Sequence, residues 1–289
     1  MNDFDPYINE IYAFCEEQGI KIDTLSQEMG PAQFEINFPH GNPLMLADHV
    51  FLFKRTVREA AIKHDVYATF LAKPMEEEAG SALHIHQSVI NTDSGNNIFS
   101  TKAGRPSRLF SSYIAGLQKY MPEALLIFAP YVNSYRRFLN PWTSPINLAW
   151  GVDNRTVGLR VPDSDSEARR VENRLAGSDV NPYLAIAATL ACGYLGIEEG
   201  LQAGDPVEGS VYNNEDTIHE FLHGRFDKIP NTLHPHIYVS ITAMKNSIAM
   251  RKMLGDEFVS LYCSMKADEY REFQSIITPW EREILMLNV

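Results

Sequence analysis

Apolar residues recur at helical spacing along much of this 289-residue chain. Ile8, Ile11, Tyr12 and Cys15 repeat at the spacing of one helix face, and Gly19 is a typical residue at which such a helix ends. The pattern predicts helices over residues 5–18, 44–64 and 107–119, after Pro122, from Pro182 to about Gly200, and through most of the chain from the loop near 204–209 to Trp280.

Short stretches between the helices alternate apolar and polar residues, which is the pattern of a strand with one buried face. Phe34, Ile36 and Phe38 alternate with polar residues in this way. Strands are predicted over Gln33–Phe38, Ala68–Ala72, Leu83–Ile90 and Ala168–Arg174, with two more inside residues 145–162. The strands are clustered and helices flank them, which favours an α+β fold over a regular βαβ repeat.

The composition limits the possible partners and compartments. The chain is 45% hydrophobic, enough for one large domain or two smaller ones, and its net charge of −12 argues against nucleic acid as a partner. Cys15, Cys192 and Cys263 lack metal-ligand spacing and suit a reduced, cytoplasmic protein. No apolar run reaches the length of a membrane span, and the first residues are acidic, unlike those of a signal peptide.

The segment Ala168–Arg174 carries charged residues at alternate positions. In a strand, Arg170, Glu172 and Arg174 share one face, while Val171 points to the other. Burying such a row is costly without partners, and a phosphate beside the arginines with a divalent metal ion beside the glutamate would supply them. A solvated, salt-bridged face is the alternative, which similar chemistry elsewhere in the chain disfavours.

Two pairs of residues are candidate metal ligands. Glu28 and Glu35 bracket a tight turn, and paired carboxylates suit a hard cation such as Mg²⁺ or Mn²⁺, although surface glutamates are common. His84 and His86 share one face of their predicted strand, where they could bind a metal ion or a phosphate, or form a hydrogen-bonded polar face. Gly80, just before them, would let the backbone approach a ligand closely.

Arginines are concentrated in the polar segments of the middle of the chain. Seven of them occur there: Arg136, Arg137, Arg155, Arg160, Arg169, Arg170 and Arg174. A guanidinium group binds a carboxylate or a phosphate through two parallel hydrogen bonds, which a lysine cannot do. In an acidic protein this concentration of arginines indicates a small anionic ligand.

The same segments resemble those of a known family. The chain resembles the catalytic domain of the glutamine synthetase family in a series of motifs that runs nearly from end to end. The motifs are Gly30–Glu35 (GPAQFE), Ala68–Pro74 (ATFLAKP), Gly80–Ser88 (GSALHIHQS), Asn133–Arg137 (NSYRR), Asn154–Pro162 (NRTVGLRVP), Ala168–Glu172 (ARRVE) and Asn181–Leu184 (NPYL). They are most similar to those of the γ-glutamylpolyamine (γ-glutamylputrescine) synthetases, which join glutamate to amines larger than ammonia.

This resemblance implies a fold and a reaction. The fold would be a curved antiparallel sheet flanked by helices, forming one catalytic domain over residues 1–289. ATP would phosphorylate the γ-carboxylate of L-glutamate, and an alkylamine or polyamine would then displace the phosphate. Two or more Mg²⁺ or Mn²⁺ ions would neutralise the charge on the phosphates. Members of the family form rings, so a homo-oligomer is expected for the full-length form.

The resemblance also implies roles for individual residues. Divalent ions would be held by Glu28, Glu35, His84 and Glu172. ATP would be contacted by Asp23, His86, Ser88, Arg155 and Arg170. Glutamate or its phosphate would be bound by Gly80, Arg137 and Arg174. Arg160 would contact the transferred phosphoryl group, and Arg137, Arg155 and Arg160 would be the catalytic residues.

The chain departs from the family pattern at four points. It begins after the position of a small β-grasp domain and of a strand with two more metal-binding glutamates, so both metal sites are expected to lack those ligands. Thr143 replaces a glutamate that binds ammonium, which favours an alkylamine. Ala79 replaces an asparagine that contacts glutamate, and Glu167 replaces a lysine near ATP.

Three other functions remain open. Glutamate–ammonia ligase activity is one, although Thr143 argues against it. An inactive module that binds nucleotide or glutamate is another, suggested by the late start of the chain. A metallohydrolase built on His84 and His86 is the weakest of the three, because no third ligand stands close to them in the sequence.

Overall fold

The computed structural model describes residues 2–139, 144–212 and 232–289. Thr143 therefore lies outside the described residues. The helices and strands, in chain order, are α1 Asp5–Glu17, β1 Thr24–Gln27, β2 Phe34–Asn37, α2 Pro43–Lys63, β3 Ile85–Gln87, α3 Arg108–Phe128, α4 Val132–Arg136, β4 Trp150–Val152, β5 Leu159–Val161, β6 Val171–Asn173, α5 Pro182–Glu198, α7 Ile237–Asn246, α8 Ile248–Leu254 and α9 Asp256–Gln274. Short 3₁₀ turns cover Asn2–Phe4 and Arg137–Leu139, and a π-helical turn covers Glu281–Leu285.

The strands form two small sheets. β1 and β2 make an antiparallel hairpin in which Ser26 lies opposite Glu35. The other sheet has the order β3-β6-β5-β4, with β3–β6 and β6–β5 antiparallel and β5–β4 parallel. The α+β prediction is confirmed, but the expectation of an antiparallel sheet is wrong for β4, because the loop of residues 153–158 carries the chain back far enough for β5 to run parallel to β4, with Trp150 opposite Leu159.

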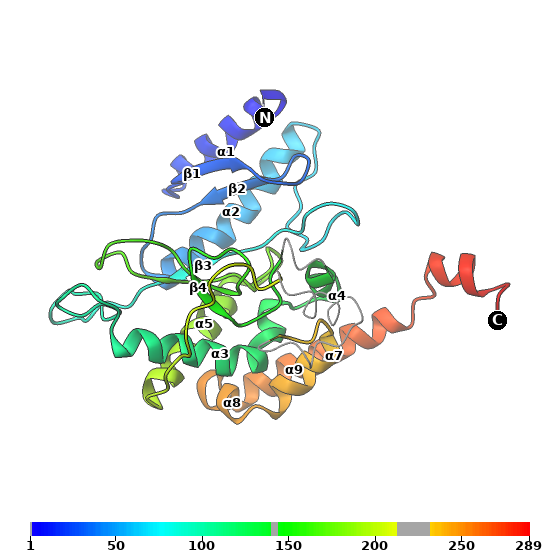
Figure 1. Cartoon of the computed structure of the whole chain (residues 1–289). Coiled ribbons are helices and arrows are strands. Elements are labelled where there is room, and N and C mark those ends of the chain that lie inside the picture. The colour runs from blue at the N-terminus through cyan, green and yellow to red at the C-terminus, as the bar shows by residue number, and fades with distance from the viewer. Residues whose placement is uncertain (1, 140–143, 213–231) are drawn as a thin grey trace.

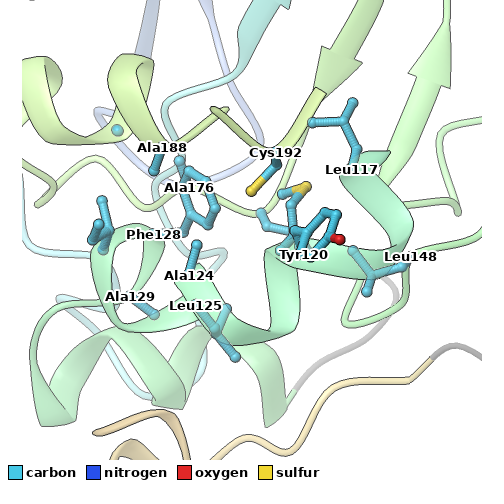
Figure 2. Packing of buried hydrophobic residues seen from close by; sticks show 14 of the residues in the cluster. Leu117, Tyr120, Ala124, Leu125, Phe128, Ala129, Leu148, Ala176, Ala188 and Cys192 are labelled. Atoms are coloured by element: carbon cyan, nitrogen blue, oxygen red, sulfur yellow. The ribbon is translucent and has the colours of Figure 1, made fainter. Parts of the chain in front are cut away.

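Two hydrophobic clusters hold the fold together. The larger one joins α3 and α5 to the four-stranded sheet and to the C-terminal helices, and Figure 2 shows Leu117 and Phe128 of α3 packed with Cys192 of α5. The smaller one packs α1 against α2 and the β1–β2 hairpin. Figure 1 shows α1 and the β1–β2 hairpin above the four-stranded sheet and α3, α8 and α9 below it, while α2 and α5 pack against each other. In the described parts of the chain, no helix combines the length and the apolar character needed to cross a membrane.

The helix predictions are confirmed for α1, α2, α5 and, after residue 236, for α7 to α9, while residues 213–231 of the last predicted helical stretch lie outside the described residues. The prediction at Pro122 is wrong, because Pro122 does not begin a new helix. α3 is continuous from Arg108 to Phe128 with Pro122 inside it. A proline removes one backbone hydrogen bond from a helix interior. Met121, Ala124 and Leu125 next to Pro122 are all buried in the larger cluster, so tertiary packing keeps the helix continuous.

Three of the predicted strands are absent or shorter. Residues 68–72 form no strand in the described structure, and the chain bends at Ala72. Their carbonyl groups accept hydrogen bonds from loop residues instead of from a partner strand. The Phe70 carbonyl accepts from the Ser178 hydroxyl at 2.9 Å, and the Ala72 carbonyl accepts from the Ser81 amide at 2.8 Å. β3 and β6 are each shorter than the segments predicted for them, 83–90 and 168–174.

Glycines bring the backbones of α3 and α5 into direct contact. A Cβ atom at Gly116 would lie 2.4 Å from the carbonyl oxygen of Cys192, and one at Gly196 would lie 2.1 Å from that of Ser112. Backbone atoms on both helices face these positions, so a side chain there could be accommodated only if the helices moved apart.

We therefore expect Gly116→Ala to lower the free energy of unfolding by about 2 kcal/mol, even though alanine favours a helix. Gly204→Ala is the matched control, because nothing lies within 4 Å of a Cβ atom at Gly204; its effect should stay within about 0.5 kcal/mol. Urea unfolding of both variants measures the difference. Equal stability of the two variants would contradict the close contact between the helices.

Lys54 of α2 connects the two clusters. Its ammonium group donates hydrogen bonds to the carbonyl oxygens of Ser178, at 2.6 Å, and of Val180, at 2.9 Å. Burial lowers the pKa of Lys54 from 10.5 to about 8, while the nearby Asp179 opposes this change and Arg58 adds to it. The charged form of Lys54 is thus less stable in the folded chain than in water.

This low pKa predicts a pH-dependent stability. Below pH 8, Lys54 is charged in the folded and the unfolded chain; between about pH 8 and 10.5, only the unfolded chain retains the proton, so the contribution of Lys54 to the free energy of unfolding rises with pH. Relative to Lys54→Met, the unaltered chain should gain roughly 2 kcal/mol between about pH 7 and 10. Urea unfolding at the two pH values tests this, and a pH-independent difference would be the contrary result.

Candidate active site

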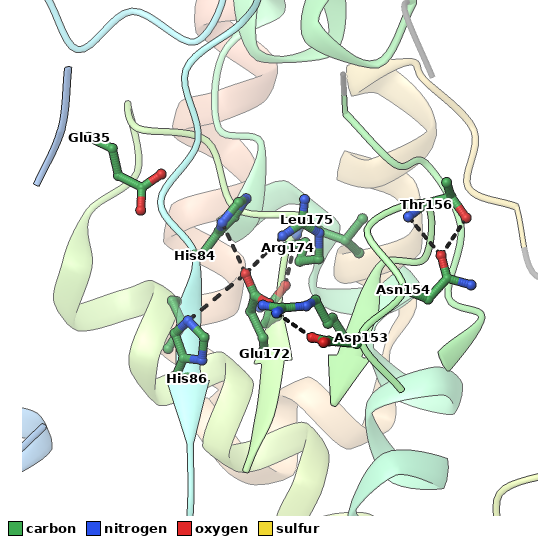
Figure 3. A network of polar contacts seen from close by, with 12 residues as sticks. Glu35, His84, His86, Asp153, Asn154, Thr156, Glu172, Arg174 and Leu175 are labelled. Carbon is green, nitrogen blue, oxygen red and sulfur yellow. Dashed lines mark hydrogen bonds and ion pairs between the residues drawn. The ribbon is translucent and has the colours of Figure 1, made fainter. Parts of the chain in front are cut away.

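A buried carboxylate lies at the centre of a polar cluster on the four-stranded sheet (Figure 3). The side chain of Glu172 is only 2% exposed. One of its oxygens accepts from Nδ1 of His84 at 3.0 Å and from Nη1 of Arg174 at 2.9 Å, and the other accepts from Nη1 of Arg160 at 3.0 Å. His86 lies farther away, with Nε2 at 3.9 Å from Glu172.

Strand register brings these side chains together. His86 on β3 and Arg160 on β5 lie directly opposite Glu172 on the central strand β6. His84 and Arg174 stand two residues along the chain from His86 and Glu172, and therefore on the same face of the sheet. Alternation also turns Ile85 and Val171 into the core. Glu172 and Arg174 therefore lie on one face of the sheet, as the sequence pattern predicted.

The electrostatics of the cluster favour an ionised glutamate and neutral histidines. Burial alone would raise the pKa of Glu172, but the hydrogen bond from His84 and the charge of Arg174 hold it well below its usual range. Burial lowers the pKa of His84 and of His86, although Glu172 opposes both changes. A neutral His84 that donates from Nδ1 to Glu172 keeps the lone pair of Nε2 for another partner.

Several buried guanidinium groups have unused donors. The Nε atoms of Arg137, Arg160 and Arg174 are buried and have no hydrogen-bond partner among the described residues. Arg160 also bonds the Asp153 carboxylate at 2.6 Å. Buried N–H groups are rarely left without a partner in native proteins, so unused donors in one cluster indicate a site for an anion.

Arg137 lies deepest. It is 2% exposed, donates to the carbonyl oxygen of Leu175, and packs so closely on Gly80 that a Cβ atom there would lie 2.5 Å from Cγ of Arg137. Burial lowers the pKa of Arg137 to about 10, and the negative charge of Asp179 opposes this change. Asp179 is itself fixed by the Ser134 hydroxyl, which donates to it at 2.6 Å.

A second carboxylate pair lies on the β1–β2 hairpin. A hydrogen bond with the Glu35 carboxylate raises the pKa of Glu28, because it stabilises the protonated form, and burial and the charge of Glu35 act in the same direction. Arg155 is near enough to oppose this change, and the negative charge of Glu172 is near enough to act on the pKa of Glu35. Figure 3 shows the Glu35 carboxylate directed toward His84. The four predicted metal ligands thus gather in one region.

These residues fit a hard divalent cation in part. Among the described residues, no three His, Cys, Asp or Glu side chains come together as a metal site. Two carboxylates nevertheless suit Mg²⁺, which keeps several waters and commonly takes other ligands from substrate phosphates. Glu28 and Glu35 would hold one ion, and His84 with Glu172 would help to hold another, for which Glu172 would exchange an arginine partner.

The predicted ATP contacts are less well gathered. Arg170 is close to the cluster, with Nε 3.4 Å from Nδ1 of His86. Arg155 lines a cavity of about 550 Å³ between the turn after β4 and residues 206–210. Asp23 lies at the open end of the hairpin, where its backbone amide bonds Asn37, and the side chains of Asp23 and Ser88 make no polar contact with the cluster in the described structure.

Sequence reasoning missed several residues that build the site. Asp153 pairs with Arg160, Asp179 faces Arg137 electrostatically, and Gln33 bonds Gly80 and Ser81. Asp153 and Gln33 stand inside or next to the quoted motifs, so their position was a usable signal. Asp179 carried no such signal, because nothing in the sequence shows which buried charge it would face.

Comparison with known proteins agrees with this geometry. The family model "Glutamine synthetase, catalytic domain" matches residues 1–285. The chain is 37% identical to γ-glutamylputrescine synthetase PuuA of Escherichia coli (strain K12), covering 100% of this chain and 58% of that protein. It is 33% identical to a glutamate–isopropylamine ligase of a Pseudomonas species, covering 95% of this chain and 58% of that protein.

Solved structures show the same fold. A structure of GmaS without ligand superimposes with a TM-score of 0.83 at 28% identity, and the match covers 99% of this chain and 63% of GmaS. The chain therefore spans less than two thirds of the length of these relatives. Family model, relatives and fold agree, and the chain belongs to the glutamine synthetase family.

Proposed function

We propose that the chain carries out ATP-dependent joining of the γ-carboxylate of L-glutamate to an alkylamine or polyamine, through a γ-glutamyl phosphate. The observation that carries this proposal is the set of buried arginine donors around Glu172, a carboxylate whose charge also acts on Glu35 of the Glu28–Glu35 pair. Such a site suits a phosphorylated carboxylate together with a divalent cation. The names of the relatives that join glutamate to putrescine and to isopropylamine support the amine class.

In this proposal, each part of the site has a role in the reaction. Arg137 and Arg174, with the backbone at Gly80, hold the glutamate so that an oxygen of its γ-carboxylate faces the γ-phosphorus of ATP. Arg155 and Arg170 contact the ATP phosphates from the other side. That oxygen forms a bond to phosphorus, and the bond to ADP breaks. Bound Mg²⁺ or Mn²⁺ would neutralise charge on the phosphates.

The second step uses the same arginines. The amine nitrogen attacks the acyl carbon, phosphate leaves with the electrons of the bond that breaks, and the nitrogen loses a proton to water. Arg160, which is fixed by Glu172 and Asp153, faces the phosphoryl group and stabilises its charge as it leaves. As part of this proposal, residues 1–289 act as one catalytic domain, and the full-length protein is a homo-oligomer.

Ammonia is the competing substrate, because relatives named glutamine synthetase, such as that of Halobacterium salinarum at 32% identity, are also similar to the chain. With ATP, glutamate and Mg²⁺, we expect putrescine or a short alkylamine to give a kcat/KM at least about tenfold above that for ammonium. Mass spectrometry of the products and phosphate release measure this. Use of ammonia alone would reject the alkylamine proposal, and binding of ATP and glutamate without turnover would favour a binding module.

Arg160→Lys keeps a positive charge but loses the planar fork that reaches Glu172 and Asp153 together. We expect single-turnover phosphate release to slow by about 100-fold while the Kd for ATP changes by less than about threefold. Arg58→Lys, on the exposed side of α2, makes the same chemical change away from the site and should leave the rate unaltered. A loss of ATP affinity equal to the loss of rate would assign Arg160 to nucleotide binding instead.

A further inference from the structure

The two halves of the site belong to different hydrophobic clusters. Glu28 and Glu35 lie on the β1–β2 hairpin, whose residues Ile36 and Phe38 pack on the smaller cluster. His84, Arg137 and Glu172 lie on elements of the larger cluster. α2 packs against α5 where the two clusters meet, and polar bonds across the junction help to fix the carboxylate pair relative to the arginines.

Gln33 makes such a bond beside the ligands themselves. Its amide nitrogen donates to the carbonyl oxygen of Gly80 at 3.1 Å and to the hydroxyl of Ser81 at 3.0 Å. Its amide oxygen accepts from the backbone of Gly30 at 2.9 Å. The Gln33 side chain therefore donates hydrogen bonds to the loop that contains Gly80 and Ser81 and accepts one from its own hairpin turn.

The hairpin turn transmits a movement of Glu28 to Gln33. The Glu28 amide donates to the carbonyl oxygen of Gln33 at 2.8 Å, and the Gln33 amide donates to that of Gly30 at 3.1 Å. Ala32 between them has a positive φ of 53°, which tightens the turn. A cation that draws the two carboxylates together would thus fix the position of the Gln33 side chain.

Gly80 and Ser81, which accept the hydrogen bonds from Gln33, are also held in place by other contacts. Gly80 lies against Arg137, with a Cβ position 2.5 Å from Cγ of that arginine, and 2.8 Å from the carbonyl oxygen of Ala72. The Ser81 carbonyl accepts from the Ser178 amide at 3.0 Å. Pulling the Gly80 carbonyl toward Gln33 therefore changes the packing on the arginine that is proposed to bind glutamate.

We propose that Gln33 is a positioning residue that couples cation binding at Glu28 and Glu35 to glutamate binding at Gly80 and Arg137. This inference rests on the proposed function for the identity of the two ligands. The side-chain amide of Gln33 joins the two sites directly, so each ligand stabilises the arrangement that the other requires. Coupling of this kind is reciprocal: glutamate must raise the affinity for the cation by the same factor as the cation raises the affinity for glutamate.

The test measures binding in the chain without ATP or amine. Calorimetry gives the Kd for L-glutamate with and without saturating Mn²⁺, and electron paramagnetic resonance gives the Kd for Mn²⁺ with and without glutamate. In the unaltered chain, we expect each ligand to raise the affinity for the other by at least about fivefold. Gln33→Met, which removes the amide, should reduce this factor to below about twofold, with a Kd for Mn²⁺ alone within about threefold of the unaltered value.

Two further variants separate coupling from folding. Gln33→Glu keeps an oxygen for the Gly30 amide but has no donor for Gly80, so it should also lose the coupling. Gln27→Met makes the same change as Gln33→Met on the exposed side of the hairpin and should retain it. Thermal unfolding confirms that all variants are folded.

The possible outcomes are distinct. Coupling that persists in Gln33→Met, Mn²⁺ binding that disappears in it, or coupling that is lost equally in Gln27→Met would each overturn the role of Gln33. The proposed function fails separately, if the unaltered chain binds neither glutamate nor Mn²⁺. Absence of coupling in an unaltered chain that binds both ligands would reject the inference and leave the proposed function standing.

Discussion

A single buried carboxylate, that of Glu172, is the constraint on which the rest of the site depends. Moving an ionised carboxylate out of water costs several kcal/mol, and it is stable only with charged or hydrogen-bonding partners in good geometry. His84, Arg160 and Arg174 supply them from three segments at 2.9–3.0 Å. A shift of one residue in the register of β3 or β5 would turn His86 or Arg160 to the opposite face. The register of the strands therefore determines whether Glu172 has the partners that keep it ionised.

The site lies where two hydrophobic clusters meet, and this location shapes its chemistry. Carboxylates come from the hairpin on the smaller cluster, and most of the basic groups come from the larger one. The contacts across the junction include polar bonds from Lys54 and Gln33. A junction held in this way can adjust by small amounts more readily than a close-packed core, which suits a site that must accept ligands of opposite charge.

The sequence predicted those features that depend on local pattern. Alternation in Ala168–Arg174 placed Glu172 and Arg174 on one face, and helical spacing located α1, α2 and α5 to within a few residues. It did not predict features that depend on tertiary contact. The continuity of α3 through Pro122 comes from buried neighbours, and residues 68–72 bond to Ser81 and Ser178 instead of to a partner strand. The pairing of Arg160 with Asp153 is a tertiary contact between β5 and the residue after β4, which the sequence pattern does not reveal.

The arginine cluster is not arranged for stability alone. Arg137, Arg160 and Arg174 each keep a buried Nε–H group without a partner among the described residues, and an unsatisfied buried donor costs about 1–3 kcal/mol. Glu172 offers only two oxygens, which are already used by His84 and two of the arginines. A phosphorylated substrate would bring additional oxygens to these donors. It would also compete with Glu172 for the arginines and so release that carboxylate toward a cation, which means that, on the proposed function, the anion and the cation would assemble the site together.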